Sequence, residues 1–532
     1  MTAPAQAAQA TVLALHHGYR IAGGEERAAE QLAALAEREL GERVAWIRRD
    51  STKLSAADAA RGLLAGGTGA GEVAEALAAS GADLLHAHNL FPTFGPAALR
   101  AARDAGAAVV VHLHNYRLVC AVATNVRDGH DCTECHRGKP GPGLRHRCRG
   151  NLPEAAAYAA ALPRWQAAVI ELADVVIVPS AAARARLLDL GLGLPADRVH
   201  VIGGVAEQVV ERSRSSAGRF ALLVSRLAPE KDVRTAIDAC RMASLPLVIA
   251  GDGPERAALE EYAGPPPTGS IGTGATTTRA SEPAPAVTPE PGVKPRSLYR
   301  GASRRSDAVT ERIRRPATPP PLREFPAHID PFLSQATPPP SAAPPPGHQK
   351  PAIWPAPSKE PPAVGRDATP PPAGPTSGAS PREQHALEAL LGSEVLALLD
   401  GEPVLRGNTV FIGRASERVL AALRARARIG LATSVAHETF GLSALESMSA
   451  ALPTAGSAVG ALPELLGDNA VVTPRDPAAL ANLITRLAGN DAAGDAAARR
   501  AVEHAAPQLV AARLAAAYTA ARDQNAGRSA YR

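Results

Sequence analysis

Short apolar runs alternate with longer stretches in which apolar residues recur at helical spacing, and this pattern covers most of the chain. In the first half the helical spacing is clear over Glu25–Glu39 and Ala155–Leu172. The apolar runs are typical of buried strands and lie at Thr11–Leu15, Val44–Ile47, Asp83–His86, Ala108–His112, Val175–Val178 and Val199–Ile202. Strands that alternate with helices predict βαβ units and a parallel sheet.

A second series of the same kind follows in the second half of the chain. Its apolar runs lie at Phe220–Val224, Leu247–Ala250, Thr409–Ile412, Ile429–Ala432, Pro453–Ala455 and Val471–Thr473. Because 532 residues exceed what one core usually holds, we predict an α/β protein with two Rossmann-like, doubly wound domains that face a cleft. Ligands of such folds bind at the carboxyl ends of the strands, which places the expected site in that cleft.

The second series is interrupted by a segment of different composition. Residues 264–382 are rich in Pro, Ser, Thr, Gly and Ala and show no sustained period. Such a composition buries too little apolar surface to offset the entropy of ordering, so we predict a disordered, proline-rich insertion. It is either a tolerated loop expansion or a docking segment for a partner protein. The predicted domains are residues 1–205, residues 206–263 with 383–500, and a C-terminal helix and tail in 501–532.

Composition narrows the classes of function. The chain has 57 Lys and Arg against 52 Asp and Glu, and only 3% of its residues are aromatic, so we expect no nucleic-acid partner. No run reaches the roughly 18 apolar residues of a membrane span. The first ten residues lack the basic start and apolar core of a secretion signal. The expected compartment is therefore the cytoplasm.

Two glutamates in the segment HETFGLSALESMSA are the first candidates for chemistry. Glu438 is predicted to precede a helix that starts near Leu442, and Glu446 to lie one turn inside that helix. A helix N-terminus favours anionic groups such as a donor phosphate. A carboxylate one turn further in can accept two hydrogen bonds from ribose hydroxyls. Taken alone, however, such a pair means little, because a solvated helix face is its usual explanation.

Three further motifs give the glutamates their context. SRLAPEKD places Arg226 and Lys231 after a strand, AGDGPE at 250–255 follows the next strand, and SAVGALPELL at 457–466 follows the strand after the glutamate helix. In this order and spacing the four segments resemble the donor-binding half of family-four glycosyltransferases of the GT-B fold. An arginine can donate two hydrogen bonds to phosphate oxygens, and a lysine adds a point charge.

The resemblance implies a retaining transferase of the hexosyltransferase type that uses a nucleotide-diphosphate sugar and no catalytic metal. It assigns Arg226 and Lys231 to the diphosphate, Glu446 to the ribose and Glu438 to the donor sugar. The donor site is expected to comprise Gly23, Gly24, Arg226, Lys231, Glu438, Gly441, Leu442 and Glu446.

The first half carries motifs that resemble the acceptor half of the same family. In HHGYRIAGGEER, Gly23 and Gly24 separate the first strand from the first helix, so that backbone amides can approach a phosphate, although a simple turn explains them equally well. In VVVHLHNYRLVC, His114 occupies the position of an active-site histidine of the family; the alternative is a histidine that merely closes a strand. Weaker candidates of the same kind are His16, His86, His88 and His112.

Four cysteines form a third group: Cys120, Cys132, Cys135 and Cys148. The central pair has the two-residue spacing that structural zinc sites favour, and four thiolates would complete the coordination of the metal. We therefore predict a structural zinc beside the acceptor cleft, with free or transiently oxidised thiols as the alternative. Some members of the resembled family carry a comparable cysteine-bearing loop.

The chain also departs from the family pattern. The family commonly has Pro at the place of Thr439, a second Gly at the place of Ala461 and Pro at the place of Ala121. Each of these changes could alter the shape of its loop, the affinity for the donor or the choice of acceptor. They remove no charged group that transfer needs.

The expected acceptor is a growing polysaccharide or a lipid-linked sugar, and the latter would bring the protein to the inner membrane face. The family fold also implies that the last helical stretch, about Asp495–Ala521, crosses back to the first domain. Two other functions stay open. One is a nucleotide-sugar epimerase of the same fold, which product analysis distinguishes, and the other is a non-catalytic nucleotide-sugar-binding partner protein.

Overall fold

The computed structural model describes residues 11–19, 23–136, 138–206, 212–265 and 380–530. Contacts group the described residues into one compact unit. The predicted proline-rich insertion, apart from its two ends, lies outside the described residues. In the described part of the chain no helix is both long and apolar enough to cross a membrane.

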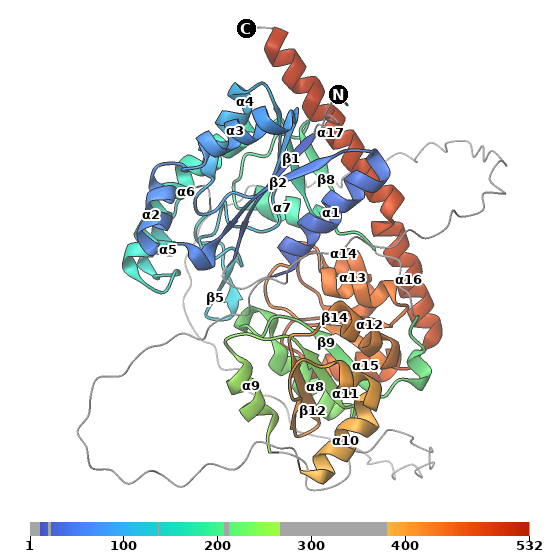
Figure 1. The fold of residues 1–532 in the computed structure, drawn as a ribbon. Helices are drawn as coiled ribbons and strands as arrows, with labels where there is room; N and C mark the ends of the chain where they lie inside the picture. Colours follow the sequence, from blue (N-terminus) through green and yellow to red (C-terminus); the bar gives the residue numbers. More distant parts are fainter. Residues whose placement is uncertain (1–10, 20–22, 137, 207–211, 266–379, 531–532) are drawn as a thin grey trace, which may run out of the picture. The chain divides into compact units, whose positions relative to one another are not determined.

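The first half of the chain folds around a six-stranded parallel sheet (Figure 1). Its strands run in the order β2-β1-β3-β4-β7-β8 and comprise β1 (Val12–Gly18), β2 (Val44–Asp50), β3 (Leu84–Asn89), β4 (Ala108–His112), β7 (Val175–Val178) and β8 (Val199–Val201). Its helices are α1 (Gly24–Leu40), α2 (Ala56–Leu64), α3 (Ala70–Ser80), α4 (Gly95–Asp104), α6 (Leu152–Leu172) and α7 (Ala181–Asp189). The central strands β3, β4 and β7 are buried along their whole length, as expected for parallel strands covered on both faces.

The second half forms a seven-stranded sheet in the order β11-β12-β10-β9-β13-β14-β15. Its strands are β9 (Phe220–Val224), β10 (Leu247–Ala250), β11 (Val404–Arg406), β12 (Thr409–Gly413), β13 (Ala427–Ala432), β14 (Thr454–Ser457) and β15 (Val471–Val472). Its helices are α8 (Val233–Met242), α9 (Arg256–Ala263), α10 (Pro381–Leu391), α11 (Ser393–Leu398), α12 (Glu417–Arg426), α13 (Leu442–Ser449), α14 (Leu462–Leu466), α15 (Pro477–Leu487) and α16 (Asp491–Ala505). Only the pairing of β11 with β12 is antiparallel among the described strands of this sheet. Two sheets of this kind confirm the predicted pair of Rossmann-like domains.

Two features were not predicted. The edge strand β11 turns back onto β12 through Gly407, whose φ of 54° lies in the left-handed region. In the cysteine-bearing loop, β5 (Val126–Arg127) and β6 (His130–Asp131) pair as a small hairpin, followed by the short helix α5 (Gly141–Arg145).

The predicted last helical stretch is two helices, α16 and α17 (Pro507–Ala530), separated at Ala506. The residue before a proline avoids the helical region, and Ala506 has a ψ of 137°, so Pro507 ends one helix and begins the next. Helix α17 packs against the first sheet through apolar side chains that include Val510, Leu514 and Tyr518. These side chains contact buried residues of β1, β3 and β4. The C-terminal helix therefore covers one face of the N-terminal sheet.

Candidate active site

One cavity of about 1020 Å³ is lined by residues from both halves of the chain. All of the residues that we assigned to the donor site or to catalysis line it: Gly23, Gly24, His114, Arg226, Lys231, Glu438, Gly441, Leu442 and Glu446. They come from the loops that follow parallel strands and from the first turns of the helices after those loops, where ligands of this fold class bind. The structure thus brings together side chains that lie more than 400 residues apart in sequence.

The two cations that we assigned to the donor diphosphate each contact a carboxylate. Lys231 Nζ lies 2.5 Å from Glu438 Oε1, and the Arg226 guanidinium forms an ion pair with Glu230 one helical turn away. The backbone beneath them is tied to the end of β13, because Thr433 Oγ1 donates to the carbonyl oxygen of Lys231 over 3.0 Å. Both cations remain partly exposed, so an anionic ligand can reach them.

Glycines let the loops that carry these charges pack closely. A Cβ on Gly251, whose φ is 144°, would lie 1.8 Å from the carbonyl oxygen of Ser225, and one on Gly253 would lie 2.2 Å from that of Leu227. A Cβ on Gly460 would lie 2.4 Å from the backbone nitrogen and oxygen of Glu438. Larger residues at these positions would push apart the loops that place Arg226 and Glu438.

Helix α13 presents its N-terminus and Glu446 to the cavity. Gly441 supplies the left-handed cap, with a φ of 97°, and the helix begins at Leu442 as the sequence predicted. Glu446 is held between two arginines: it forms an ion pair with Arg424 of α12, and its Oε1 lies 3.0 Å from Arg27 NH1 of α1. These arginines were not predicted, although Arg27 follows the Gly23-Gly24 pair by only one helical turn.

On the acceptor side, His114 follows β4 and faces a buried carboxylate. Glu25 accepts hydrogen bonds from Asn115 Nδ2 at 2.6 Å and from the Tyr19 hydroxyl at 2.9 Å. Burial alone would raise the pKa of Glu25, but the neighbouring His16, His114 and Asn115 bring it below its usual value. Burial lowers the pKa of His114 to about 4 against the opposing effect of Glu25, so its imidazole is neutral near pH 7.

Contacts between the two halves converge on the turn before α13. Thr439 Oγ1 donates to the carbonyl oxygen of His114 over 2.8 Å, and Ser180 Oγ donates to the carbonyl oxygen of Thr439 over 2.7 Å. A proline at this position, common in the resembled family, would lack the hydroxyl that reaches His114. The ring of Phe440 leaves no room for a Cβ on Gly203 or Gly204, which follow β8 and were not predicted to matter.

Two further arginines line the acceptor side of the cavity without having been predicted. The Arg117 guanidinium lies 4.9 Å from the centre of the Tyr19 ring, and that of Arg149 lies 4.6 Å from the Tyr158 ring. Arg149 also forms an ion pair with Glu154. The attraction between a cation and the face of an aromatic ring helps to hold each guanidinium in place.

The four cysteines of the loop line a separate small cavity of about 20 Å³. A single water requires about 10–15 Å³, so the cavity has room for one ion. Burial, with the other three thiols nearby, raises the pKa of Cys135 to about 11. Among the described residues, the group with three ligand atoms within 4.8 Å of one another consists of histidines, so no three of the loop sulfurs lie that close together. The residues fit a zinc ion in number, type and enclosure, and the thiols would have to turn inward to bind it.

Solved structures similar to this chain include Anabaena HepE in complex with UDP and glucose, which is 13% identical. That match covers 96% of this chain and 99% of HepE, with a TM-score of 0.47. Sucrose-phosphate synthase from Thermosynechococcus elongatus is 14% identical over 96% of this chain and 98% of its own, with a TM-score of 0.49. No curated protein sequence matches the chain.

Two family models match the sequence directly. The model described as a glycosyl transferase 4-like domain matches residues 3–204, and the model described as glycosyl transferases group 1 matches residues 380–490. The two matches together span more than half of the chain and correspond to the two sheets described above. The chain belongs to the family-four glycosyltransferases of the GT-B fold.

Proposed function

We propose that this glycosyltransferase moves a hexose from a nucleotide-diphosphate sugar to a glycan or lipid-linked acceptor, with retention of the anomeric configuration. The observation that carries the proposal is the arrangement of Arg226, Lys231, Glu446 and the N-terminus of α13 around one cavity. Cations and a helix N-terminus suit a diphosphate, and a carboxylate inside the helix suits a ribose.

The proposed mechanism rests on charge that develops on the leaving group. As the bond between the sugar and the diphosphate breaks, negative charge grows on the phosphate oxygen that departs. Arg226 and Lys231 stabilise this charge because they are already fixed in place before reaction. In the protein without donor, their partners are Glu230 and Glu438, and the phosphates would take over the role of those carboxylates.

The remaining side chains orient the sugar. Once Lys231 turns to the phosphate, Glu438 is free to accept a hydrogen bond from a sugar hydroxyl. His114, neutral near pH 7, can exchange a hydrogen bond with another hydroxyl without adding charge beside the reacting carbon. No catalytic metal is assigned to this scheme.

The loop beside the acceptor side is proposed to hold a structural zinc on Cys120, Cys132, Cys135 and Cys148. Backbone amides of three of the four cysteines already donate hydrogen bonds, from Cys120 N to the oxygen of Tyr116, from Cys132 N to that of Asn125 and from Cys148 N to that of Gly143. Thiolates are ligands that zinc prefers, and four of them close its coordination shell. The zinc would hold the loop in place and take no part in transfer.

The proposed donor is tested by screening nucleotide sugars for thermal stabilisation of the full chain. A ligand that binds the folded state raises the melting temperature by mass action. Incubation of the stabilising donor with candidate acceptors, followed by product analysis, then distinguishes transfer from epimerisation. A sugar-bearing acceptor with the same anomeric configuration as the donor is the expected product, whereas an inverted product or an epimerised donor would refute the proposal.

A further inference from the structure

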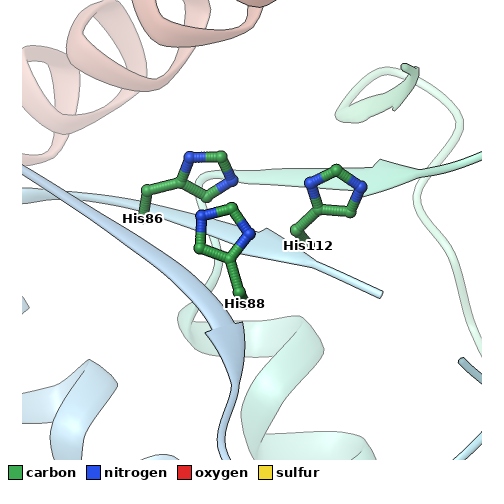
Figure 2. A group of neighbouring side chains, drawn as sticks. All are labelled: His86, His88 and His112. Atoms are coloured by element: carbon green, nitrogen blue, oxygen red, sulfur yellow. The ribbon is translucent and has the colours of Figure 1, made fainter. Parts of the chain in front are cut away.

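Three buried histidines lie under the acceptor side of the cavity and have no role in the proposed transfer. His86 and His88 are two residues apart on β3, so they face the same side of the sheet, and His112 ends the neighbouring strand β4. Each offers a ring nitrogen within 4.8 Å of the others, and none is more than 4% exposed. Figure 2 shows the rings of His86 and His112 pointing toward one another, with His88 beside them.

The cluster contains two buried ring nitrogens without a hydrogen-bond partner among the described residues, His86 Nε2 and His112 Nδ1. Burial lowers the pKa of His86 to about 3 and brings the pKa values of His88 and His112 well below their usual value. The three rings are therefore neutral near pH 7. A buried polar atom without a partner lowers the stability of the fold, and a bound ligand would supply the missing partner.

We propose that His86, His88 and His112 bind a single zinc ion. Neutral imidazoles are among the commonest zinc ligands, and three of them leave a fourth position open. Zinc–nitrogen bonds of about 2.0–2.1 Å require the nitrogens to stand roughly 3.4 Å apart. The nitrogens now lie within 4.8 Å of one another, so the rings would have to turn toward a shared centre when the ion binds.

The surroundings of the cluster match those of a metal site. Ligand histidines usually use their second ring nitrogen to bind an outer partner that orients the ring. His86 Nδ1 lies 2.9 Å from the Tyr518 hydroxyl of α17, which leaves Nε2 directed into the cluster. His112 lines the large cavity, so an ion can enter from there.

The site would lie directly beside the active-site histidine. His88 Nδ1 is 2.9 Å from His114 Nε2, and the rings of His112 and His114 stack with their centres 3.8 Å apart. An ion would join β3, β4 and, through Tyr518, α17 beneath His114. This role concerns the support of the site and does not depend on the proposed donor or acceptor.

The proposal is tested with cobalt(II), a paramagnetic stand-in for zinc, added to the full chain. We expect three shifted imidazole resonances in the proton spectrum of the cobalt-loaded protein. A cobalt bound by the four cysteines would instead give a thiolate-to-cobalt absorption band and no imidazole signal, so the two proposed sites are read separately. Absence of shifted imidazole signals at saturating cobalt would overturn the proposal.

Variants supply the second measurement. His112→Gln should weaken cobalt binding at the nitrogen site at least about 10- to 100-fold, since even the loss of an outer partner costs that much. His200→Gln is the matched control, because His200 lies on β8 and is not part of the cluster. Equal affinity of the two variants would refute the assignment. If His112→Gln does not fold, the cobalt-shifted imidazole resonances of the unaltered protein decide by themselves whether the histidines bind the ion.

Discussion

Glu446 shows how much of this site depends on pairs of residues that are distant in sequence. The helix that carries it could be predicted, because the resemblance and the turn before Leu442 both indicate it. Its partners Arg27 and Arg424 could not, since they come from α1 and α12 and no local pattern connects them to Glu446. The same holds for Gly203, whose need to be small arises only from the ring of Phe440.

The proposed division between charge stabilisation and donor binding predicts different kinetic effects for three residues. Arg226→Ala and Lys231→Ala should lower kcat about 100- to 1000-fold, since each removes a fixed group that faces developing charge. Glu446→Ala should mainly raise the donor KM, by an amount equivalent to roughly 1.5–3 kcal/mol for a lost charged hydrogen bond. Steady-state kinetics with varied donor measure both effects.

Arg241→Ala is the matched control for these variants. Arg241 pairs with Asp238 on α8 and does not line the large cavity. It should leave both constants near those of the unaltered enzyme. Near-normal kcat and KM in all three site variants, with normal folding, would contradict the assignment of the donor site.

The hydroxyl of Thr439 offers a test of how the two halves align. It donates to the backbone oxygen of His114, so Thr439→Val keeps the shape of the side chain but leaves that oxygen without its partner. A neutral hydrogen bond contributes about 0.5–1.5 kcal/mol, and we expect kcat to fall by roughly 2- to 10-fold. Thr439→Ser should restore most of the turnover, and an equal loss in both variants would show that the hydroxyl is not what matters.

Among the elements, the buried parallel strands were predicted most closely. β4, β7, β9 and β10 begin and end at the predicted residues, because each contains a compact run of apolar residues that is typical of a buried parallel strand. Strand β11 and the hairpin of β5 and β6 were missed, since strands of two or three partly exposed residues leave no period in the sequence. Their positions depend on pairing with neighbours, which the sequence does not display.

The C-terminal helix makes a charge cluster whose contribution should depend on pH. Arg522 of α17 donates to Glu42 over 2.8 Å and to Asp83 over 2.9 Å. Burial opposes the charged form of Glu42, but hydrogen bonds from Arg522 and Thr11 lower its pKa below the usual value. A carboxylate with a lowered pKa stabilises the fold above its ordinary pKa, and this contribution disappears as the pH falls through the folded value.

Arg522→Gln should therefore lower the melting temperature at pH 7 and have less effect near pH 3. Because the cluster is partly exposed, we expect the free energy of unfolding at pH 7 to fall by only about 0.5–1 kcal/mol. Thermal unfolding of both proteins across this pH range checks the prediction. Arg513→Gln, on the same helix, is the control, and an Arg522→Gln effect that grows on acidification would contradict the sign argued above.

The cysteine loop predicts a metal content that can be measured directly. The loop should hold about one zinc in protein purified without added metal, apart from any ion at the histidine cluster. The zinc content should therefore be about one per chain lower in Cys132→Ser and in Cys135→Ser than in Cys240→Ser, because Cys240 is buried in the core of the second sheet. Elemental analysis with thiol titration before and after chelation makes the measurement. Four freely titratable loop thiols in metal-loaded protein would rule out this site, whereas the histidine site is judged from its own signals.

At the scale of the whole molecule, several contacts join the two halves around the large cavity. Glu464 of α14 accepts hydrogen bonds from the first amides of α7, at 3.3 Å from Ala181 N and 3.1 Å from Ala182 N. A carboxylate at a helix N-terminus stabilises the helix, because it accepts hydrogen bonds from the free amides and interacts favourably with the helix dipole. The general two-domain plan followed from the two series of strands, but these contacts depend on side chains whose partners no sequence pattern identifies.

The last prediction concerns the segment that interrupts the second half. Both of its flanks are anchored: Gly407 N donates to the oxygen of Pro265 over 2.9 Å, and α10 begins with a capping box at Ser380 and Glu383. Apolar residues of α10, including Leu387 and Leu391, lie in the core beside Leu405 and Val410. The intervening chain therefore has to connect these two anchored flanks.

Replacing residues 268–378 with a short Gly/Ser linker should leave folding and donor-induced thermal stabilisation intact. Each halving of a flexible loop changes its closure cost by only about 0.6 kcal/mol, in the favourable direction when the loop is shortened. Thermal unfolding with and without donor, together with turnover on a soluble acceptor, makes the comparison. A large fall in melting temperature would show that the segment contributes to the fold. Normal turnover of the purified variant combined with loss of function in cells would instead favour the docking segment over the loop expansion.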